Sequence, residues 1–103
     1  MKSEIEYHPL VEADATEAAV WYEAQQPGLS DRFVDEYLRV LRTLPRTALI
    51  YAVRFGDIRR VNLPSFPYGV FYFLTGEQIV VLGVLHGARE IRSELERRRT
   101  TFG

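Results

Sequence analysis

The sequence predicts a single α+β domain in which a helical hairpin packs on one face of a mostly antiparallel sheet, in the order β-α-α-β-β-β. Two amphipathic stretches, separated by a short Pro-Gly connection, lie in the first half of the chain. Two continuously apolar runs lie in the second half. The length of 103 residues is sufficient for one hydrophobic core. We therefore expect residues 1–103 to form one domain.

The first half predicts a short strand followed by two helices. Residues 3–7 alternate weakly between polar and apolar side chains, which is typical of a strand. We expect Pro9 in the first turn of the first helix and Pro27-Gly28 at its end. Ser30 is the expected N-cap of the second helix and Pro45 its expected end. The apolar stripes are Val11, Ala15, Ala18 and Tyr22 in the first helix, and Phe33, Tyr37, Val40, Leu41 and Leu44 in the second.

The second half predicts three strands. Residues 58–63 alternate, whereas residues 68–74 and 79–86 are almost continuously apolar, as expected for strands buried on both faces. Thr75-Gly76-Glu77 predicts the hairpin turn between the last two strands. For residues 90–103 two alternatives stay open: a short terminal helix, or a tail that is flexible or ordered by a partner.

Composition excludes several classes of protein. The absence of cysteine excludes disulfides, thiol nucleophiles and cysteine-ligated zinc. The longest apolar stretch, residues 79–85, is too short to cross a bilayer, and the first residues lack the apolar region of a signal peptide. His8 and His86 do not have metal-ligand spacing. We therefore expect a cytoplasmic protein without membrane contact, metal or cofactor.

Charge is distributed unevenly along the chain. Residues 1–44 carry nine acidic side chains against four basic ones, whereas residues 45–103 carry nine arginines against five acidic side chains. Either the two regions have no partner, or the arginines form a basic face that docks nucleic acid or an acidic peptide. The net charge of −1 argues against a protein whose main partner is nucleic acid.

Two residues near the end of the last predicted strand are candidates for chemistry. His86 is followed three positions later by Arg89. An imidazole that transfers a proton beside a guanidinium that holds a phosphate suits metal-independent RNA cleavage. In the alternative interpretation, His86 caps the strand through a backbone hydrogen bond and Arg89 pairs with Glu90 or Glu94.

Arg60 is the second candidate for a functional surface. In a regular strand Arg59 and Arg60 point to opposite faces, so one site can use only one of them. Arg60 shares its face with Asn62, opposite Val61 and Leu63, and is therefore the better candidate for the open face of the sheet.

Aromatic side chains are expected mainly in the core. Those of the predicted strand at residues 68–74 suit core packing better than a platform for stacking bases. They are Tyr68, Phe71, Tyr72 and Phe73. Tyr22 belongs to a helical stripe, and we expect it and Trp21 to pack between the helices.

Several segments, in this order and spacing, cover nearly the whole chain. They are Tyr7-His8-Pro9; Ala19-Val20-Trp21-Tyr22-Glu23; Pro27-Gly28-Leu29 with Arg32-Phe33; Pro45; Ile58-Arg59-Arg60; Phe66-Pro67-Tyr68 leading to Tyr72; and Val84-Leu85-His86-Gly87-Ala88-Arg89. Together they resemble the RelE/ParE toxin superfamily of bacterial type II toxin–antitoxin systems. The Trp-Tyr-Glu and Phe-Pro-Tyr segments are more similar to ParE than to RelE.

The resemblance to ParE implies a growth-inhibiting toxin that binds DNA gyrase and is neutralised in a hetero-oligomer with a cognate antitoxin. It implies a target or antitoxin surface formed by Arg60, Asn62, Tyr68, His86, Arg89, Arg97, Arg98 and Arg99. We expect the sheet face opposite the hairpin to be vacant, and an acidic, apolar antitoxin segment to cover that face and the sheet edge.

Two alternatives remain within the superfamily. A RelE-like protein would be a ribosome-dependent mRNA endoribonuclease, in which Arg60 and Arg89 hold the scissile phosphate and His86 is the acid or base. The chain departs from that pattern because it ends without a tyrosine, has Lys2 as its single lysine and is nearly neutral. The other alternative is a non-toxic member that acts only as a binding module.

Overall fold

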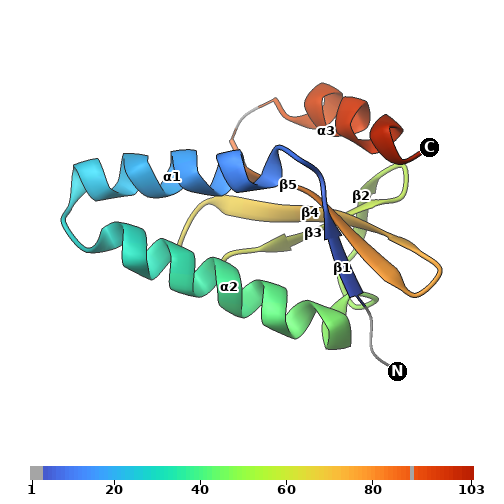
Figure 1. Ribbon diagram of the computed structural model, residues 1–103, viewed down its shortest axis with the longest axis horizontal. Helices are drawn as coiled ribbons and strands as arrows, with labels where there is room; N and C mark the ends of the chain where they lie inside the picture. The colour runs from blue at the N-terminus through green and yellow to red at the C-terminus, as the bar shows by residue number, and fades with distance from the viewer. Residues whose placement is uncertain (1–3, 89) are drawn as a thin grey trace.

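The computed structural model describes residues 4–88 and 90–103 and contains a five-stranded sheet with a helical hairpin on one face (Figure 1). The elements are β1 (Glu4–Tyr7), α1 (Val11–Gln25), α2 (Leu29–Thr47), β2 (Val53–Phe55), β3 (Ile58–Asn62), β4 (Tyr68–Thr75), β5 (Gln78–His86), α3 (Arg92–Arg99) and the 3-10 helix η1 (Thr100–Phe102). The strand order is β1-β5-β4-β3-β2, and only the β1–β5 pair is parallel. The predicted α+β class and order of elements are confirmed, with β2 as an additional edge strand.

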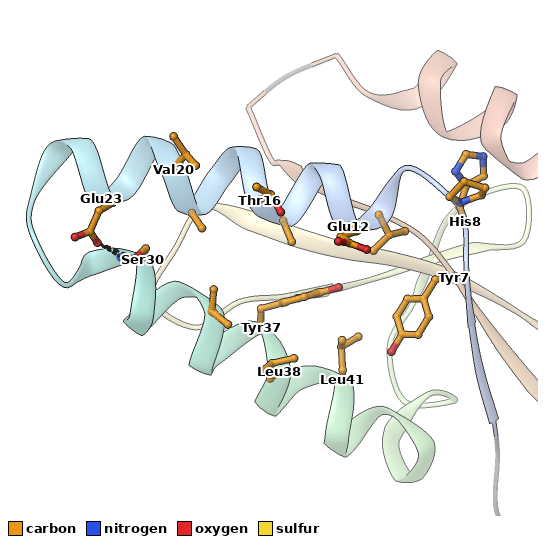
Figure 2. A pocket seen from close by; sticks show the side chains of 15 residues that line it. Tyr7, His8, Glu12, Thr16, Val20, Glu23, Ser30, Tyr37, Leu38 and Leu41 are labelled. Carbon is orange, nitrogen blue, oxygen red and sulfur yellow. Dashed lines mark hydrogen bonds between the residues drawn. The ribbon is translucent and has the colours of Figure 1, made fainter.

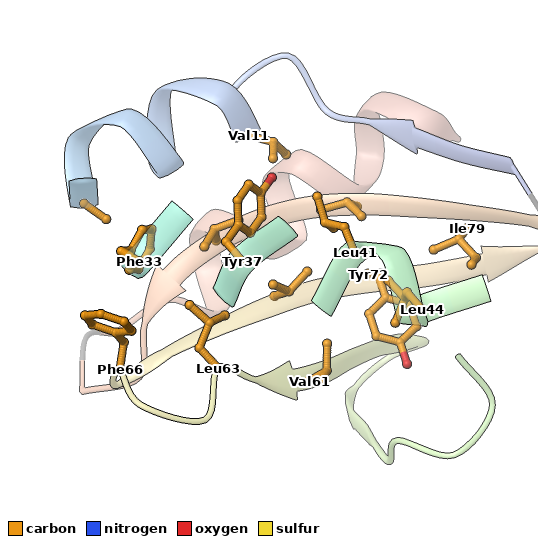
Figure 3. Close-up of a cluster of buried hydrophobic side chains, with 14 of the residues drawn as sticks. Val11, Phe33, Tyr37, Leu41, Leu44, Val61, Leu63, Phe66, Tyr72 and Ile79 are labelled. Atoms are coloured by element: carbon orange, nitrogen blue, oxygen red, sulfur yellow. The ribbon is translucent and has the colours of Figure 1, made fainter. Parts of the chain in front are cut away.

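The helical hairpin buries the stripes that the sequence predicts. Phe33 and Leu44 of α2 are fully buried, and Val11, Ala18 and Tyr22 of α1 are at most 9% exposed. They pack against the sheet side chains of one face, which Figure 3 shows beneath α2. Burying one such side chain stabilises the folded state by about 1.5–3 kcal/mol. Most of the buried apolar side chains lie on this face, which therefore supplies most of the core.

The predicted end of α2 at Pro45 is wrong, because the helix continues to Thr47. Proline removes one helical hydrogen bond, but two contacts favour a further turn. Ala48, one turn after Leu44, is buried, and its carbonyl accepts a hydrogen bond of 2.7 Å from the hydroxyl of Tyr72. This anchors the end of α2 to β4, and burial raises the pKa of the Tyr72 hydroxyl to about 12.

The second face of the sheet is covered by the chain itself, so the expectation of a vacant face is wrong. Leu95 of α3 is fully buried against a cluster from the strands. The cluster contains Ile58, Phe71, Phe73, Val80 and Leu82, flanked by Phe55, Leu85, Ile91 and Phe102. The rest of α3 is polar, so Leu95 and the nearby Ile91 and Phe102 make its apolar contacts with the sheet. Because these apolar residues are so few, the sequence pattern did not predict how α3 packs.

A buried ion pair joins α3 to α1. The guanidinium of Arg98 donates to both carboxylate oxygens of Asp14, at 2.6 and 3.1 Å. The two side chains are 7% and 10% exposed. Arg98 also donates to Glu94 at 2.7 Å and to the carbonyl of Leu82 at 3.0 Å. Burial alone disfavours the charged form, but these hydrogen bonds and charges raise the pKa of Arg98.

The ion pair also completes a β-bulge in β5. Phe71 pairs with Gly83 and Tyr72 with Val81, so Leu82 is the extra residue. The Leu82 carbonyl accepts from Arg98, and the Val84 N–H donates to Asp14 at 3.1 Å. A Cβ at Gly83 would lie 2.9 Å from the Arg98 guanidinium. Glycine is therefore required for the ion pair to reach the strand.

We predict that Arg98→Met destabilises the fold by about 3–5 kcal/mol, because it leaves the carboxylate of Asp14 buried without its counterion. Arg97→Met is the matched control on the same helix, since Arg97 is 72% exposed and pairs with Glu94 at the surface. The control should cost less than about 1 kcal/mol. Urea unfolding measures both, and equal losses in the two variants would contradict the role given to Arg98.

Candidate functional site

His86 and Tyr68 lie together on the hairpin side of the sheet. They are partners across β4 and β5, and their rings meet edge to face at 5.3 Å. The Nδ1 atom of His86 accepts a hydrogen bond of 3.0 Å from the backbone N–H of Ala88. The alternative in which His86 makes a capping backbone hydrogen bond at the strand end is therefore confirmed.

A hollow of about 420 Å³ opens beside His86, and α1 contributes to its wall. Its lining is mostly aromatic and consists of Glu17, Trp21, Tyr22, Pro67, Tyr68 and His86. Tyr22 packs in the core as predicted, but Trp21 is 56% exposed. The expected packing of Trp21 between the helices is thus wrong, because its position in α1 turns it toward this hollow. An imidazole and a carboxylate are present here, and none of the described arginines is part of the lining.

Arg60 and Asn62 lie on the opposite side of the sheet, as their shared face predicts. The Nε–H of Arg60 donates to the Asn62 side chain at 2.5 Å, and the guanidinium lies 5.2 Å from the ring centroid of Phe71. Phe71 belongs to the cluster covered by α3. The Arg60 guanidinium and the His86 imidazole therefore lie on opposite faces of the sheet. Arg89 lies outside the described residues.

The tail arginines are engaged in contacts within the fold. Arg97 pairs with Glu94, and Arg99 donates to both carboxylate oxygens of Asp57 at 2.9 and 3.0 Å. The hydrogen bond from Arg99 lowers the pKa of Asp57. Arg98 was expected at a binding surface, but the structure places it in the interior.

A groove between α1 and α2 is absent from the sequence-based expectations. It measures about 800 Å³ (Figure 2). Its apolar walls include Val20 and Leu38, which are 64% and 41% exposed. Tyr37 forms part of the wall, and burial, followed by the nearby Tyr7 and Asp14, raises its pKa to about 12. Val20 and Leu38 lie outside the buried apolar stripes of α1 and α2. Two apolar residues at such positions are the feature of the sequence that could have indicated the groove.

One end of the groove is closed by a carboxylate clasp between the two helices. Glu23 of α1 accepts hydrogen bonds from the backbone N–H groups of Gly28 and Ser30 and, at 2.7 Å, from the Ser30 hydroxyl (Figure 2). Gly28 has φ of 89°, a left-handed conformation that favours glycine. Ser30 was predicted as the N-cap, and this is wrong: the N-cap is Gly28, and Glu23 satisfies the free N–H groups.

The described residues were compared with the requirements of a metal centre and of a membrane-spanning helix. Within residues 4–88 and 90–103, no group of three or more potential metal ligands gathers. None of the helices described has the length and apolar character needed to span a bilayer.

Comparison with protein families assigns the chain. A family model for the ParE toxin of the type II toxin–antitoxin system parDE matches residues 5–91. The chain belongs to the ParE toxin family. The recognition made from its motifs is confirmed, and membership in the parDE system implies a cognate antitoxin as partner.

Comparison with solved structures supports the fold of this ParE toxin. A structure described as the chromosomal ParDE TA system from P. aeruginosa superposes with a TM-score of 0.72. The match covers 82% of this chain and 96% of the other, at 17% sequence identity. At this identity the similarity establishes the shared fold. No curated protein sequence matches the chain.

We predict that the Glu23 clasp of this ParE toxin weakens in acid. Hydrogen bonds from the Ser30 hydroxyl and from the N–H groups of Gly28 and Ser30 lower the pKa of Glu23. A carboxyl whose pKa is lower in the folded state stabilises the fold above its unfolded pKa of roughly 4.3, and this contribution disappears as pH falls through the folded pKa. Thermal unfolding should therefore show Glu23→Gln less stable than wild type at neutral pH.

The same comparison in acid provides the control. Below the folded pKa both side chains are neutral, so the difference between wild type and Glu23→Gln should shrink. A stability difference that is constant across the acid range would contradict a contribution from the Glu23 charge.

Proposed function

We propose that this ParE toxin inhibits growth by binding DNA gyrase, and that it acts by contact rather than by cleaving RNA. Family membership supports a toxin, and the separation of His86 from Arg60 favours a binding mechanism. Cleavage requires an acid or base and a phosphate-holding cation at the same scissile group, within a few ångströms of one another. Here the imidazole of His86 and the guanidinium of Arg60 occupy opposite faces of the sheet.

We further propose that an apolar segment of the cognate antitoxin occupies the groove between α1 and α2. Because α3 covers the apolar cluster on the second face of the sheet, an apolar antitoxin segment needs another surface. The groove has apolar walls and carries the carboxylates of Glu12 and Glu23 on its lining. A partner helix with apolar side chains in the groove and basic side chains at its border complements this composition. The proposed location is the cytoplasm, where gyrase acts.

A supercoiling assay tests the target. Purified toxin at micromolar concentration should block supercoiling of relaxed plasmid by purified gyrase, and preincubation with the antitoxin encoded beside it should restore the activity. Normal supercoiling in the presence of the free toxin would contradict the proposal.

Two further measurements separate the alternatives. Primer extension on translated mRNA would reveal cuts within codons if the protein were a ribosome-dependent endoribonuclease. Expression without the antitoxin would leave growth unchanged if the protein were a non-toxic binding module. We expect no cuts and arrested growth.

We predict that Leu38→Asp weakens antitoxin binding at least tenfold, because it places a charge in the apolar groove, where no described lysine or arginine lines the wall. Arg39→Asp is the matched control: the neighbouring residue is exposed on the same helix but does not line the groove. Its effect on affinity should be less than about threefold. Calorimetric titration with the antitoxin measures both, and similar losses in the two variants would contradict a role for the groove.

A further inference from the structure

A smaller cavity on the α3 side of the sheet gathers three arginines around a volume of about 230 Å³. Its lining comes from β2, β3, β4 and the segment that leads into α3. The residues are Arg54, Phe55, Arg60, Phe71, Gly87, Glu90, Ile91 and Arg92. These positions lie up to 38 residues apart in the sequence, so the fold rather than the local sequence brings the positive charges together.

Arg60 is held in place at the base of this cavity. Its guanidinium rests on the ring of Phe71 and its Nε–H donates to Asn62. A Cβ at Gly69 would lie 2.6 Å from its Nε, and a Cβ at Gly87 would lie 2.6 Å from its Nη2. Two glycines therefore leave the room that this side chain fills, which fixes the direction of its donors.

Two of the three arginines in the cavity, Arg54 and Arg60, have no carboxylate partner in the described part of the chain. No ion pair is made by Arg54 or Arg60 within residues 4–88 and 90–103. Arg92 lies over Phe55 and pairs with Glu96 on the exposed side of α3. Glu90, the carboxylate on the lining, accepts a hydrogen bond from the backbone N–H of Arg92 at 2.8 Å.

The surroundings of Arg60 make its charged form less favourable. Burial, and then the nearby charge of Arg54, lower the pKa of Arg60. Two guanidinium groups close together disfavour each other's charge, and an anion between them relieves this repulsion. The tail arginines differ, because each of them already pairs with a carboxylate of the protein.

We propose that this arginine cavity binds one carboxylate side chain, an aspartate or glutamate, of the cognate antitoxin. The proposal rests on the proposed neutralisation by an antitoxin and names a second contact outside the α1–α2 groove. A cavity of this volume suits one anionic group, and guanidinium donors match a carboxylate in bidentate geometry. Charge on the rest of the chain disfavours a nucleic-acid strand, because the net charge is −1 and the tail arginines are paired.

Antitoxin affinity of arginine variants tests this proposal. Arg60→Gln and Arg54→Gln should each weaken binding of the antitoxin encoded beside the toxin by about tenfold or more, and should reduce the dependence of the affinity on salt. Arg42→Gln, an exposed arginine of α2 outside the cavity, should change affinity less than twofold. Urea unfolding of each variant checks that the fold is retained.

Gly87→Ala provides an independent variant that keeps every charge. The new methyl group displaces the Arg60 guanidinium, so this variant should also lose affinity. The antitoxin's acidic residues can also be changed one at a time to the neutral amide. One such Asp→Asn or Glu→Gln change should weaken binding to the wild-type toxin but cause no further loss of affinity for the Arg60→Gln variant.

Each result has one interpretation. Affinity within twofold of wild type in both arginine variants would overturn the cavity proposal and leave the proposed function standing. Failure of the wild-type toxin to bind the antitoxin would overturn both. Unchanged antitoxin binding, together with weaker binding of a single-stranded RNA oligonucleotide by the same variants, would assign the cavity to a phosphate and contradict a carboxylate ligand.

Discussion

The structure depends on the buried ion pair between Asp14 and Arg98. Removing two charges from water is costly, and a buried pair is retained without loss only where further hydrogen bonds satisfy both groups. Here Asp14 accepts two bonds from Arg98 and one from the Val84 N–H, while Arg98 also reaches Leu82 and Glu94. No buried side-chain polar atom lacks a partner in the described residues. One interaction thereby joins α1, the bulge of β5 and α3.

The bulge explains why His86 and Arg60, two of the expected site residues, lie on opposite faces of the sheet. In a regular strand, His86 would share its face with Val80 and Leu82, on the side where Arg60 lies against Phe71. The extra residue at Leu82 reverses the alternation, so Leu85 joins the α3 side and Val84 joins the hairpin core. His86 consequently lies beside Tyr68. The protein thus presents two separate surfaces instead of one composite site.

The sequence predicted the hairpin and the two central strands because their signals are periodic and strong. The stripe containing Phe33 and Leu44 and the apolar runs in β4 and β5 need burial, and only one layered arrangement supplies it. Strand β2 was missed because its three residues do not establish an alternation. The packing of α3 was missed because it depends on Leu95 and on the ion pair of Arg98 with a residue 84 positions away.

The candidate surfaces were only partly predictable for a related reason. Arg60 and Asn62 were correctly placed on one face because β3 is regular. The position of His86 depends on a bulge, and Gly83 within an apolar run was its only local sign. The groove depends on Val20 and Leu38, whose exposed positions follow from how α1 and α2 cross and not from either helix alone.

A double-mutant cycle on Asp14 and Arg98 tests most directly whether this ion pair holds the fold together. The free energies of unfolding of wild type, Asp14→Asn, Arg98→Met and the double variant are measured under the same conditions. If the two side chains act as one unit, the second substitution costs little after the first, and the coupling reaches about 2–3 kcal/mol. Additive losses, with a coupling below about 0.5 kcal/mol, would contradict this account.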